Sequence, residues 1–276
     1  MKYDVAIAGG GLAGLSLSIQ LANKGYKTIL FEKEQYPFHK VCGEYISMES
    51  WDFLDGLGLD LMSMDLPKIS RLQVSGVSGK LLKQDLPLGG FGISRYLLDH
   101  KLSIIAKATG VELKESASVN DIQFINDEFQ ISTSIGDFIS KVAVGSYGKR
   151  SRIDLKWKRP FIMAKKNKLN NYVGVKYHLQ GTYRPDTIVL HNFRNGYCGL
   201  SKVENETFNL CYLTAAANLK DGDIRKMERA VLSENPHLKR IFEGSETKRA
   251  EPITISQISF DKKSQVEAHG WLLYPG

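Results

Sequence analysis

Apolar and polar residues alternate in short blocks along the first third of the chain, separated by glycine turns. A short apolar run containing Val5 and Ile7 is typical of a strand buried on both faces. Apolar residues then recur at helical spacing and predict a helix over 12–23, and a second apolar run at 27–31 ends on Glu32. The pattern therefore predicts a strand, a glycine turn, a helix, a strand and an acid in succession.

The pattern of predicted helices and strands changes near 157–160. Before this point helical and strand-like patterns are mixed, and after it strand-like runs predict an antiparallel sheet interrupted by one helix. Further helices are expected at 48–55, capped by Ser47, and at 95–108 and 221–233. Further strands are expected at 69–74, 79–84, 111–113, 118–125, 128–134, 137–144, 172–179, 187–192, 197–203, 207–214 and 256–260, with a separate glycine-rich segment at 89–95.

The glycine turn has the spacing G-x-G-x-x-G. Gly9 allows a tight turn, Gly11 lets the backbone approach a pyrophosphate, and Gly14 lets the helix pack close to the strand. Leu12 and Ala13 begin the helix, whose free N–H groups and positive dipole end favour a bound anion. These features predict a dinucleotide site.

Glu32 follows the glycines at the distance where a carboxylate accepts hydrogen bonds from a ribose diol, about 20 residues on. A carboxylate in this place argues against the 2′-phosphate of NADP in this site. FAD and NAD both remain open on these residues alone.

Composition is that of a globular protein. Of the 276 residues, 42% are apolar and 24% are charged. No apolar run approaches the roughly 18–20 residues of a membrane helix, and a strand with Asp4 stands where a signal peptide would be, so we expect a cytoplasmic location. The three cysteines, Cys42, Cys198 and Cys211, are widely spaced and indicate neither a zinc site nor a disulfide framework.

The net charge of +7 gathers in basic clusters at 149–152, 156–159 and 165–168. One interpretation is attraction to an anionic membrane or a nucleic acid. The favoured one is a solvated surface on a protein that handles anionic cofactors. No aromatic-interleaved nucleic-acid motif accompanies the charge, so no nucleic-acid partner is expected, and peripheral membrane contact stays as an alternative.

Two short motifs narrow the cofactor. Pro37, Lys40, Cys42 and Gly43 form P-x-x-K-x-C-G, and a helix start reads R-x-x-x-D-x-x-L from Arg95. Together with 5–33, 142–153, 196–201 and 255–260, these stretches resemble the FAD-dependent oxidoreductases of the geranylgeranyl reductase-like family, which is related to the aromatic hydroxylase (monooxygenase) flavoproteins. The resemblance covers nearly the whole chain and implies FAD as cofactor and NAD(P)H as electron donor.

The resemblance also implies roles for individual residues. Glycines of the turn hold the pyrophosphate, Glu32 the ribose, Arg95 the pyrophosphate and ribityl chain, and the motif at 37–44 lies on the flavin side, with Val119 near the adenine. The implied cofactor-binding set is Gly9, Gly11, Leu12, Ala13, Gly14, Glu32, Lys33, Lys40, Cys42, Gly43, Arg95 and Val119. Since a helix dipole disfavours a cation at a helix start, Arg95 also predicts an anion nearby.

No catalytic acid or base and no metal ligand is predicted. His39, His178 and His191 are isolated in the sequence and are more typical of surface or core histidines than of general bases. Cys42 has no companion base in the sequence, so shaping the flavin pocket suits it better than nucleophilic attack.

Two stretches depart from the family pattern. Tyr147 stands where an Asp-Gly pair is expected after the strand at 137–144. Residues 270–276 stand where the family has Gly-Asp-Ala-Ala, whose helix points at the flavin pyrimidine edge. We therefore expect a C-terminally truncated member, through a frameshift near Ala268.

The predicted fold class is α/β. A Rossmann-like FAD-binding domain with a three-layer ββα arrangement is expected over 1–155, with 68–97 as a β excursion toward the substrate side. An antiparallel-sheet substrate domain follows over 156–276, in which 266–276 start the return to the FAD domain.

The predicted function is FAD-dependent redox on an isoprenoid-like or aromatic small molecule, either reduction of an alkene or hydroxylation, with hydride from NAD(P)H. The alternatives are a truncated, non-catalytic remnant with weak or no FAD binding, an NAD-linked dehydrogenase that uses the glycine motif alone, and a peripheral membrane protein. The sequence leaves the substrate and the oligomeric state open.

Overall fold

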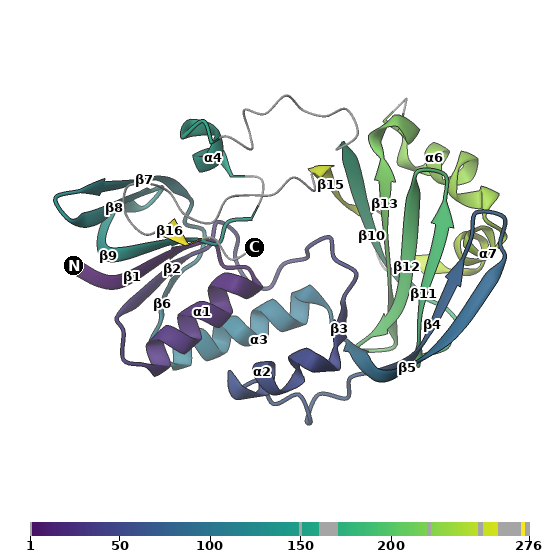
Figure 1. Ribbon diagram of the computed structural model, residues 1–276, viewed down its shortest axis with the longest axis horizontal. Coiled ribbons are helices and arrows are strands. Elements are labelled where there is room, and N and C mark those ends of the chain that lie inside the picture. Colours follow the sequence, from purple (N-terminus) through teal and green to yellow (C-terminus); the bar gives the residue numbers. More distant parts are fainter. Residues whose placement is uncertain are drawn as a thin grey trace.

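Two β-sheets, with helices packed against each, organise the computed structural model of the chain (Figure 1). The structure describes residues 2–148, 151–159, 171–219, 222–247, 251–258 and 272–273.

The first sheet has the strand order β6-β2-β1-β9-β8-β7, and β16 also pairs with β9. Its strands are β1 (Lys2–Ala8), β2 (Thr28–Phe31), β6 (Glu112–Lys114), β7 (Val119–Ile125), β8 (Glu128–Thr133), β9 (Gly136–Gly145) and β16 (Leu272–Leu273). The strands β6, β2, β1 and β9 are parallel, and Ala8 is in register with both Phe31 and Gly145. The carboxyl ends of these strands therefore meet at one edge, which is where open α/β sheets bind ligands.

The side chains of β1 alternate between two cores. Val5 and Ile7 pack with the helices α1 (Leu12–Asn23) and α3 (Arg95–Ala108), which lie side by side on one face of the sheet (Figure 1). Ala6 packs on the other face with Phe129 and Ile131 of the meander β7–β8–β9. The predicted strand buried on both faces and the three-layer ββα arrangement are therefore confirmed.

The second sheet has the order β14-β10-β13-β12-β11-β4-β5-β3, and β15 also pairs with β10. Its strands are β3 (Tyr45–Ser47), β4 (Lys68–Ser75), β5 (Leu81–Gly92), β10 (Tyr172–Gln180), β11 (Thr187–Phe193), β12 (Gly196–Val203), β13 (Thr207–Ala215), β14 (Glu246–Thr247) and β15 (Ile253–Ile258). Its pairs are antiparallel except for β4 with β11. Three strands that precede α3 in the chain thus complete the sheet formed by the later part.

The helices α6 (Ile224–Ala230) and α7 (Pro236–Gly244) cover one face of the second sheet (Figure 1). Val175 and Tyr177 of β10 belong to the core beneath them. Side chains alternate along a strand, so Lys176 and His178 of β10 point to the opposite face. That face meets residues 37–44, because Lys176 Nζ donates to the backbone oxygen of Lys40 at 3.2 Å.

The short helix α4 (Arg152–Lys156) contacts β7, and Leu54 of the short helix α2 (Trp51–Gly56) belongs to the core around α1 and α3. Asp121 of β7 secures the segment after β9, because it accepts hydrogen bonds from Lys156 Nζ and, at 3.1 Å, from Trp157 Nε1. Within the described ranges, no helix combines the length and apolar character needed to cross a membrane.

Most predicted elements are confirmed, including the helices at 12–23 and 95–108. The helix expected at 48–55 divides into a 3-10 turn, Met48–Ser50, and α2. The separate segments expected at 79–84 and 89–95 are wrong, because β5 runs through Gly89, whose φ of +68° accompanies an irregular register rather than a strand end. The strand β3 was not predicted.

The single helix expected at 221–233 is also wrong. The structure has α6, a 3-10 turn at Leu232–Glu234, and then α7. Asn235 caps α7 through the backbone N–H of His237, and Pro236 occupies its first turn, which is the usual start signal of a helix. Asp221 and the last two residues of the strand expected at 256–260 lie outside the described residues.

Candidate functional site

The glycine turn lies between β1 and α1 at the carboxyl edge of the parallel strands. Gly9 has a φ of +107°, and an added Cβ would lie 2.6 Å from the backbone oxygen of Ser146. A Cβ on Gly14 would overlap the backbone oxygen of Gly9. Both glycines are therefore required by close backbone packing, as the motif predicts.

Gly11 stands in open space by contrast. A Cβ built there would have one neighbour within 4 Å, the ammonium of Lys40 at 3.9 Å. Gly11 is the N-cap of α1, no side chain caps it, and the first turn, which contains Leu12 and Ala13, has no acidic residue. The positive end of the helix dipole is thus free to receive an external anion.

Glu32 comes directly after β2 and is 6% exposed. Its Oε2 accepts a hydrogen bond from the N–H of Gly10 at 3.0 Å, and its Oε1 accepts one from the N–H of Glu34 at 3.1 Å. The hydroxyl of Tyr36 donates to the backbone oxygen of Gly10. The Glu32 carboxylate therefore stabilises the glycine turn, and both of its oxygens keep lone pairs that can accept further hydrogen bonds.

Two other predicted residues lie around this acid. The backbone N–H of Ala117 donates to the backbone oxygen of Glu32 at 2.9 Å, which brings the start of β7 at Val119 to the end of β2. Lys33 instead points outward, with 70% of its side chain exposed and its Nζ 3.5 Å from Glu34 Oε1.

Lys40 and Arg95 converge on one buried carboxylate, Asp99. Arg95 Nε and Nη2 donate to Asp99 Oδ1 and Oδ2 at 2.8 and 2.9 Å, and Lys40 Nζ lies 2.9 Å from Asp99 Oδ2. The Asp99 side chain is 0% exposed, against 16% for Arg95 and 25% for Lys40. Asp99, on the same helix, is thus part of the anion expected near Arg95. Because Lys40 and Arg95 share this single carboxylate, a net positive charge remains beside Gly11.

Glu44 forms a second buried cluster. Its carboxylate accepts hydrogen bonds from Lys176 Nζ, from the N–H of Arg95 at 2.7 Å and, through Oε2, from His178 Nε2 at 2.9 Å. The side chains of Glu44 and Lys176 are both 0% exposed. Burial opposes the charged form of Glu44, but the His178 hydrogen bond and the Lys176 charge hold its pKa below the ordinary value.

The backbone of Cys42 and Gly43 is held by the second sheet. Asn209 Nδ2 donates to the backbone oxygen of Cys42 at 3.0 Å, and Ser201 Oγ donates to that of Gly43 at 3.3 Å. The Cys42 thiol contacts Arg95. Burial opposes the charge of Arg95, but Asp99 and, to a smaller degree, Cys42 raise its pKa above the ordinary value.

The segment after β9 carries Tyr147 at the position where the resemblance implies an Asp-Gly pair. Ser146 Oγ donates to the backbone oxygen of Gly9 at 2.5 Å, and the Tyr147 hydroxyl lies 3.5 Å from Asp154 Oδ1. Tyr147 packs against the core of the first sheet. Its side chain is therefore occupied by packing and does not replace an exposed carboxylate.

The structure brings most of the predicted cofactor set to one edge of the first sheet and adds residues that the sequence did not reveal. The histidines treated as isolated are not: His178 bonds Glu44 and contacts His39 ring to ring, and the rings of His191 and His237 stack. Lys176 was not predicted. The alternation of Lys176 and His178 with apolar residues along β10 marks a polar face and could have indicated both.

Some predicted features lie outside the described residues. They are Lys149 and Arg150, the basic cluster at 165–168, and 270–271 with 274–276 at the end of the chain. Leu272 and Leu273 are described and pair in parallel with Ala143 and Val144 of β9.

Comparison with known proteins finds one family model that matches the N-terminal part of the chain. Residues 2–127 match the family model described as FAD binding domain. The chain is 25% identical over 262 residues to "Conditioned medium factor receptor 1" of Dictyostelium discoideum, covering 86% of this chain and 51% of that protein. It is 30% identical over 125 residues to "Digeranylgeranylglycerophospholipid reductase" of Sulfolobus acidocaldarius, covering 41% of this chain and 25% of that protein. The chain therefore spans about half or less of these relatives.

Among solved structures, the flavin-dependent halogenase CmlS superposes with a TM-score of 0.83 at 16% identity, covering 99% of this chain and 52% of that one. This likeness establishes the fold: a Rossmann-like α/β domain with a sheet-rich second domain. The expected α/β class is confirmed.

Proposed function

We propose that the chain binds FAD along the carboxyl edge of the first sheet. The pyrophosphate would lie against Gly11 and the start of α1, close to Lys40 and Arg95, and the ribose would lie at Glu32. The observation that carries the proposal is the Lys40 ammonium beside an open Gly11 and an uncapped helix start. Val119 by the adenine and Cys42 and Gly43 by the flavin complete the proposed site.

The residues present fit this cofactor. A pyrophosphate is anionic, and the Lys40–Arg95–Asp99 group has one more cation than carboxylates. The lone pairs left on the Glu32 oxygens can accept from ribose hydroxyls. When bound, FAD would supply two-electron redox chemistry, with NAD(P)H as the proposed donor.

We propose as substrate an isoprenoid-like or aromatic small molecule. The supporting observations are the similarity to a protein named a digeranylgeranylglycerophospholipid reductase and the fold shared with a halogenase. In this role the Glu44 cluster holds the loop that carries Cys42 and Gly43. His178, whose side chain is 11% exposed, is the member of the Glu44–Lys176–His178 group with access to a proton from solvent.

The first experiment is the absorption spectrum of the purified chain after FAD is added and the excess removed. Retained bands of oxidised flavin support the proposal. A Lys40→Gln variant should bind FAD about tenfold or more weakly, since a charge-assisted contact contributes about 1.5–3 kcal/mol. Lys24→Gln, at the opposite and exposed end of α1, is the matched control and should bind as the parent does.

Two outcomes would contradict the proposal in different ways. A chain that folds but stays colourless favours the non-catalytic remnant. Binding of NAD without retention of flavin favours the NAD-linked dehydrogenase.

A further inference from the structure

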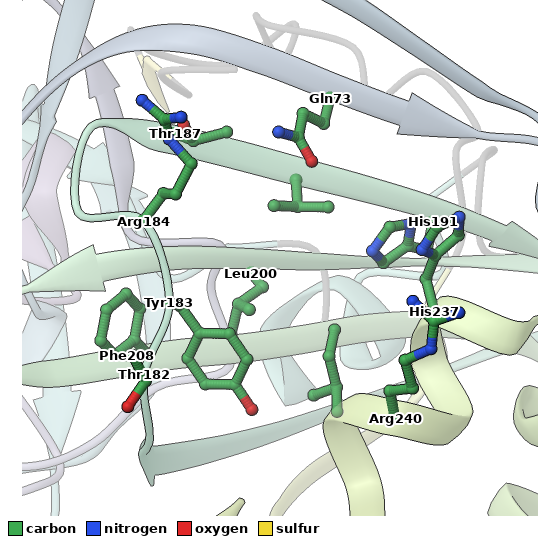
Figure 2. Close-up of a pocket in the computed structure, with 12 residues that line it drawn as sticks. Gln73, Thr182, Tyr183, Arg184, Thr187, His191, Leu200, Phe208, His237 and Arg240 are labelled. Carbon is green, nitrogen blue, oxygen red and sulfur yellow. The ribbon is translucent and has the colours of Figure 1, made fainter. Parts of the chain in front are cut away.

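A second candidate site lies on the helix-covered face of the second sheet, away from the Glu44 cluster. A pocket of about 290 Å³ opens between β11, the loop before it and α7. Side chains alternate between the two faces of the sheet along β11, as they do along β10. His191 of β11 lines the pocket. Figure 2 shows Arg240 and His237 on α7, with the His191 ring beside that of His237. This pocket therefore does not share its lining with the proposed FAD site.

The pocket is electropositive. Arg184 and Arg240 line it, and no aspartate or glutamate is among the described residues that do so. Arg184 is already neutralised, because its Nε and Nη2 donate to Asp186 Oδ1 and Oδ2 at 3.2 and 3.1 Å. Within the described ranges Arg240 has no carboxylate partner within ion-pair distance, and it is exposed at the pocket. One uncompensated guanidinium thus remains.

The two histidines give the pocket a rigid polar wall. Asn235 Nδ2 donates to Ser75 Oγ at 2.8 Å, and a second hydrogen bond of 2.8 Å joins Ser75 Oγ and His191 Nδ1. His237 Nε2 donates to the backbone oxygen of Gly79 at 2.9 Å, and the two rings stack with centroids 5.0 Å apart.

The remaining wall is apolar. Leu200, Phe208 and Ile241 reach the pocket from the core under α7 and are 3%, 4% and 7% exposed. The volume is near the lower limit of ligand pockets, roughly 300–1,000 Å³. A fitting ligand is therefore compact, with an apolar body and an anionic end.

We propose that this pocket binds a small amphipathic carboxylate, with its carboxylate on Arg240 and its apolar body against Leu200 and Phe208. The planar guanidinium matches a carboxylate in a bidentate manner. A single uncompensated cation balances a monoanion, whereas a phosphate dianion would need a second free cation, and Arg184 is committed to Asp186. The proposal does not depend on FAD binding.

Calorimetric titration of the full chain with octanoate tests this site, with octan-1-ol as the uncharged ligand of similar body. Octanoate should bind the parent, and octan-1-ol should bind at least about tenfold more weakly, since a hydrogen bond to a charged group contributes that much or more. Arg240→Gln should weaken octanoate binding by about tenfold to a hundredfold. Lys239→Gln, which removes a neighbouring exposed cation of α7, should leave the affinity unchanged.

A second variant tests the pocket without touching the charge. Val189→Phe should fill the space next to Leu200 and abolish octanoate binding, while the circular dichroism spectrum stays that of the parent. Failure of octanoate to bind the parent at millimolar concentration would overturn the proposal. So would equal affinity of octanoate for the parent and the Arg240→Gln variant, or equal binding of octanoate and octan-1-ol.

Discussion

The Glu44 carboxylate joins three parts of the chain that are far apart in sequence. It lies at the end of the 37–44 loop and bonds the N-terminus of α3 and two side chains of β10. Its φ of +56° is unusual for a residue other than glycine, so tertiary contacts hold this conformation in place. A buried ion pair of this kind is expensive to break from one side, because the remaining charge stays in the core.

Glu44→Gln should lower the free energy of unfolding by about 3–5 kcal/mol, since Lys176 is left charged and buried. The double variant Glu44→Gln with Lys176→Met should recover most of this loss, because no unpaired charge remains. Urea denaturation at pH 7 measures both. Glu206→Gln, whose carboxylate is 84% exposed beside Lys202, is the control and should change little. A double variant as unstable as the single one would contradict this explanation.

His191 should make stability depend on pH. Burial, with a smaller contribution from the charge of His237, lowers its pKa to about 4. At a pH below about 6.5, the ordinary pKa of histidine, His191 becomes protonated in the unfolded chain but stays neutral in the native chain. The free energy of unfolding therefore falls as the pH drops from about 6.5 toward 4. The expected loss from this group between pH 7 and pH 5 is roughly 2 kcal/mol.

His191→Gln should remove that contribution while keeping a polar partner for Ser75. Urea denaturation at pH 7, 6 and 5 would then show a shallower fall in unfolding free energy than in the parent. Parallel curves for the two proteins would contradict the assignment.

At the scale of elements, two glycines of the turn have different roles: Gly14 is required for folding, and Gly11 is required for the proposed binding. A Cβ at position 14 would overlap the backbone oxygen of Gly9 and force α1 away from β1, whereas position 11 is open. Gly14→Ala should therefore lower the melting temperature strongly and abolish FAD binding. Gly11→Ala should melt within about 2 °C of the parent, since surface changes stay within roughly 0.5 kcal/mol, yet bind FAD more weakly. Equal melting temperatures for the two variants would refute the distinction.

The elements that the sequence predicted well are those defined by local patterns. The apolar faces of α1 and α3 repeat within each helix, and Gly9 and Gly14 stand where close backbone packing requires glycine. The Glu44 cluster could not be read this way, because its partners lie 132 and 134 residues away along the chain. The start of α7 was missed for a local reason, since the Asn235-Pro236 signal was available and was not used.

At the scale of the whole molecule, residues 37–44 link the proposed cofactor site to the second sheet. Their backbone oxygens at Cys42 and Gly43 accept hydrogen bonds from Asn209 and Ser201 of the second sheet, while Lys40 reaches Asp99 and the glycine turn. The chain then continues directly into β3, which pairs with β5. Unfolding of one sheet should therefore deprive charged and polar groups on the other sheet of their partners.

We accordingly expect the described sheets to unfold together and FAD to stabilise both. A ligand at about 100 times its dissociation constant adds about 2.7 kcal/mol to the native state, which for a chain of this size corresponds to a rise of about 5–10 °C in melting temperature. Scanning calorimetry should show one transition that moves as a whole. Replacing the linking side chains, Asn209→Leu with Ser201→Ala, should divide it into two, of which FAD shifts mainly one. Two transitions in the parent chain, with FAD moving a single one of them, would show that the 37–44 loop does not couple the sheets.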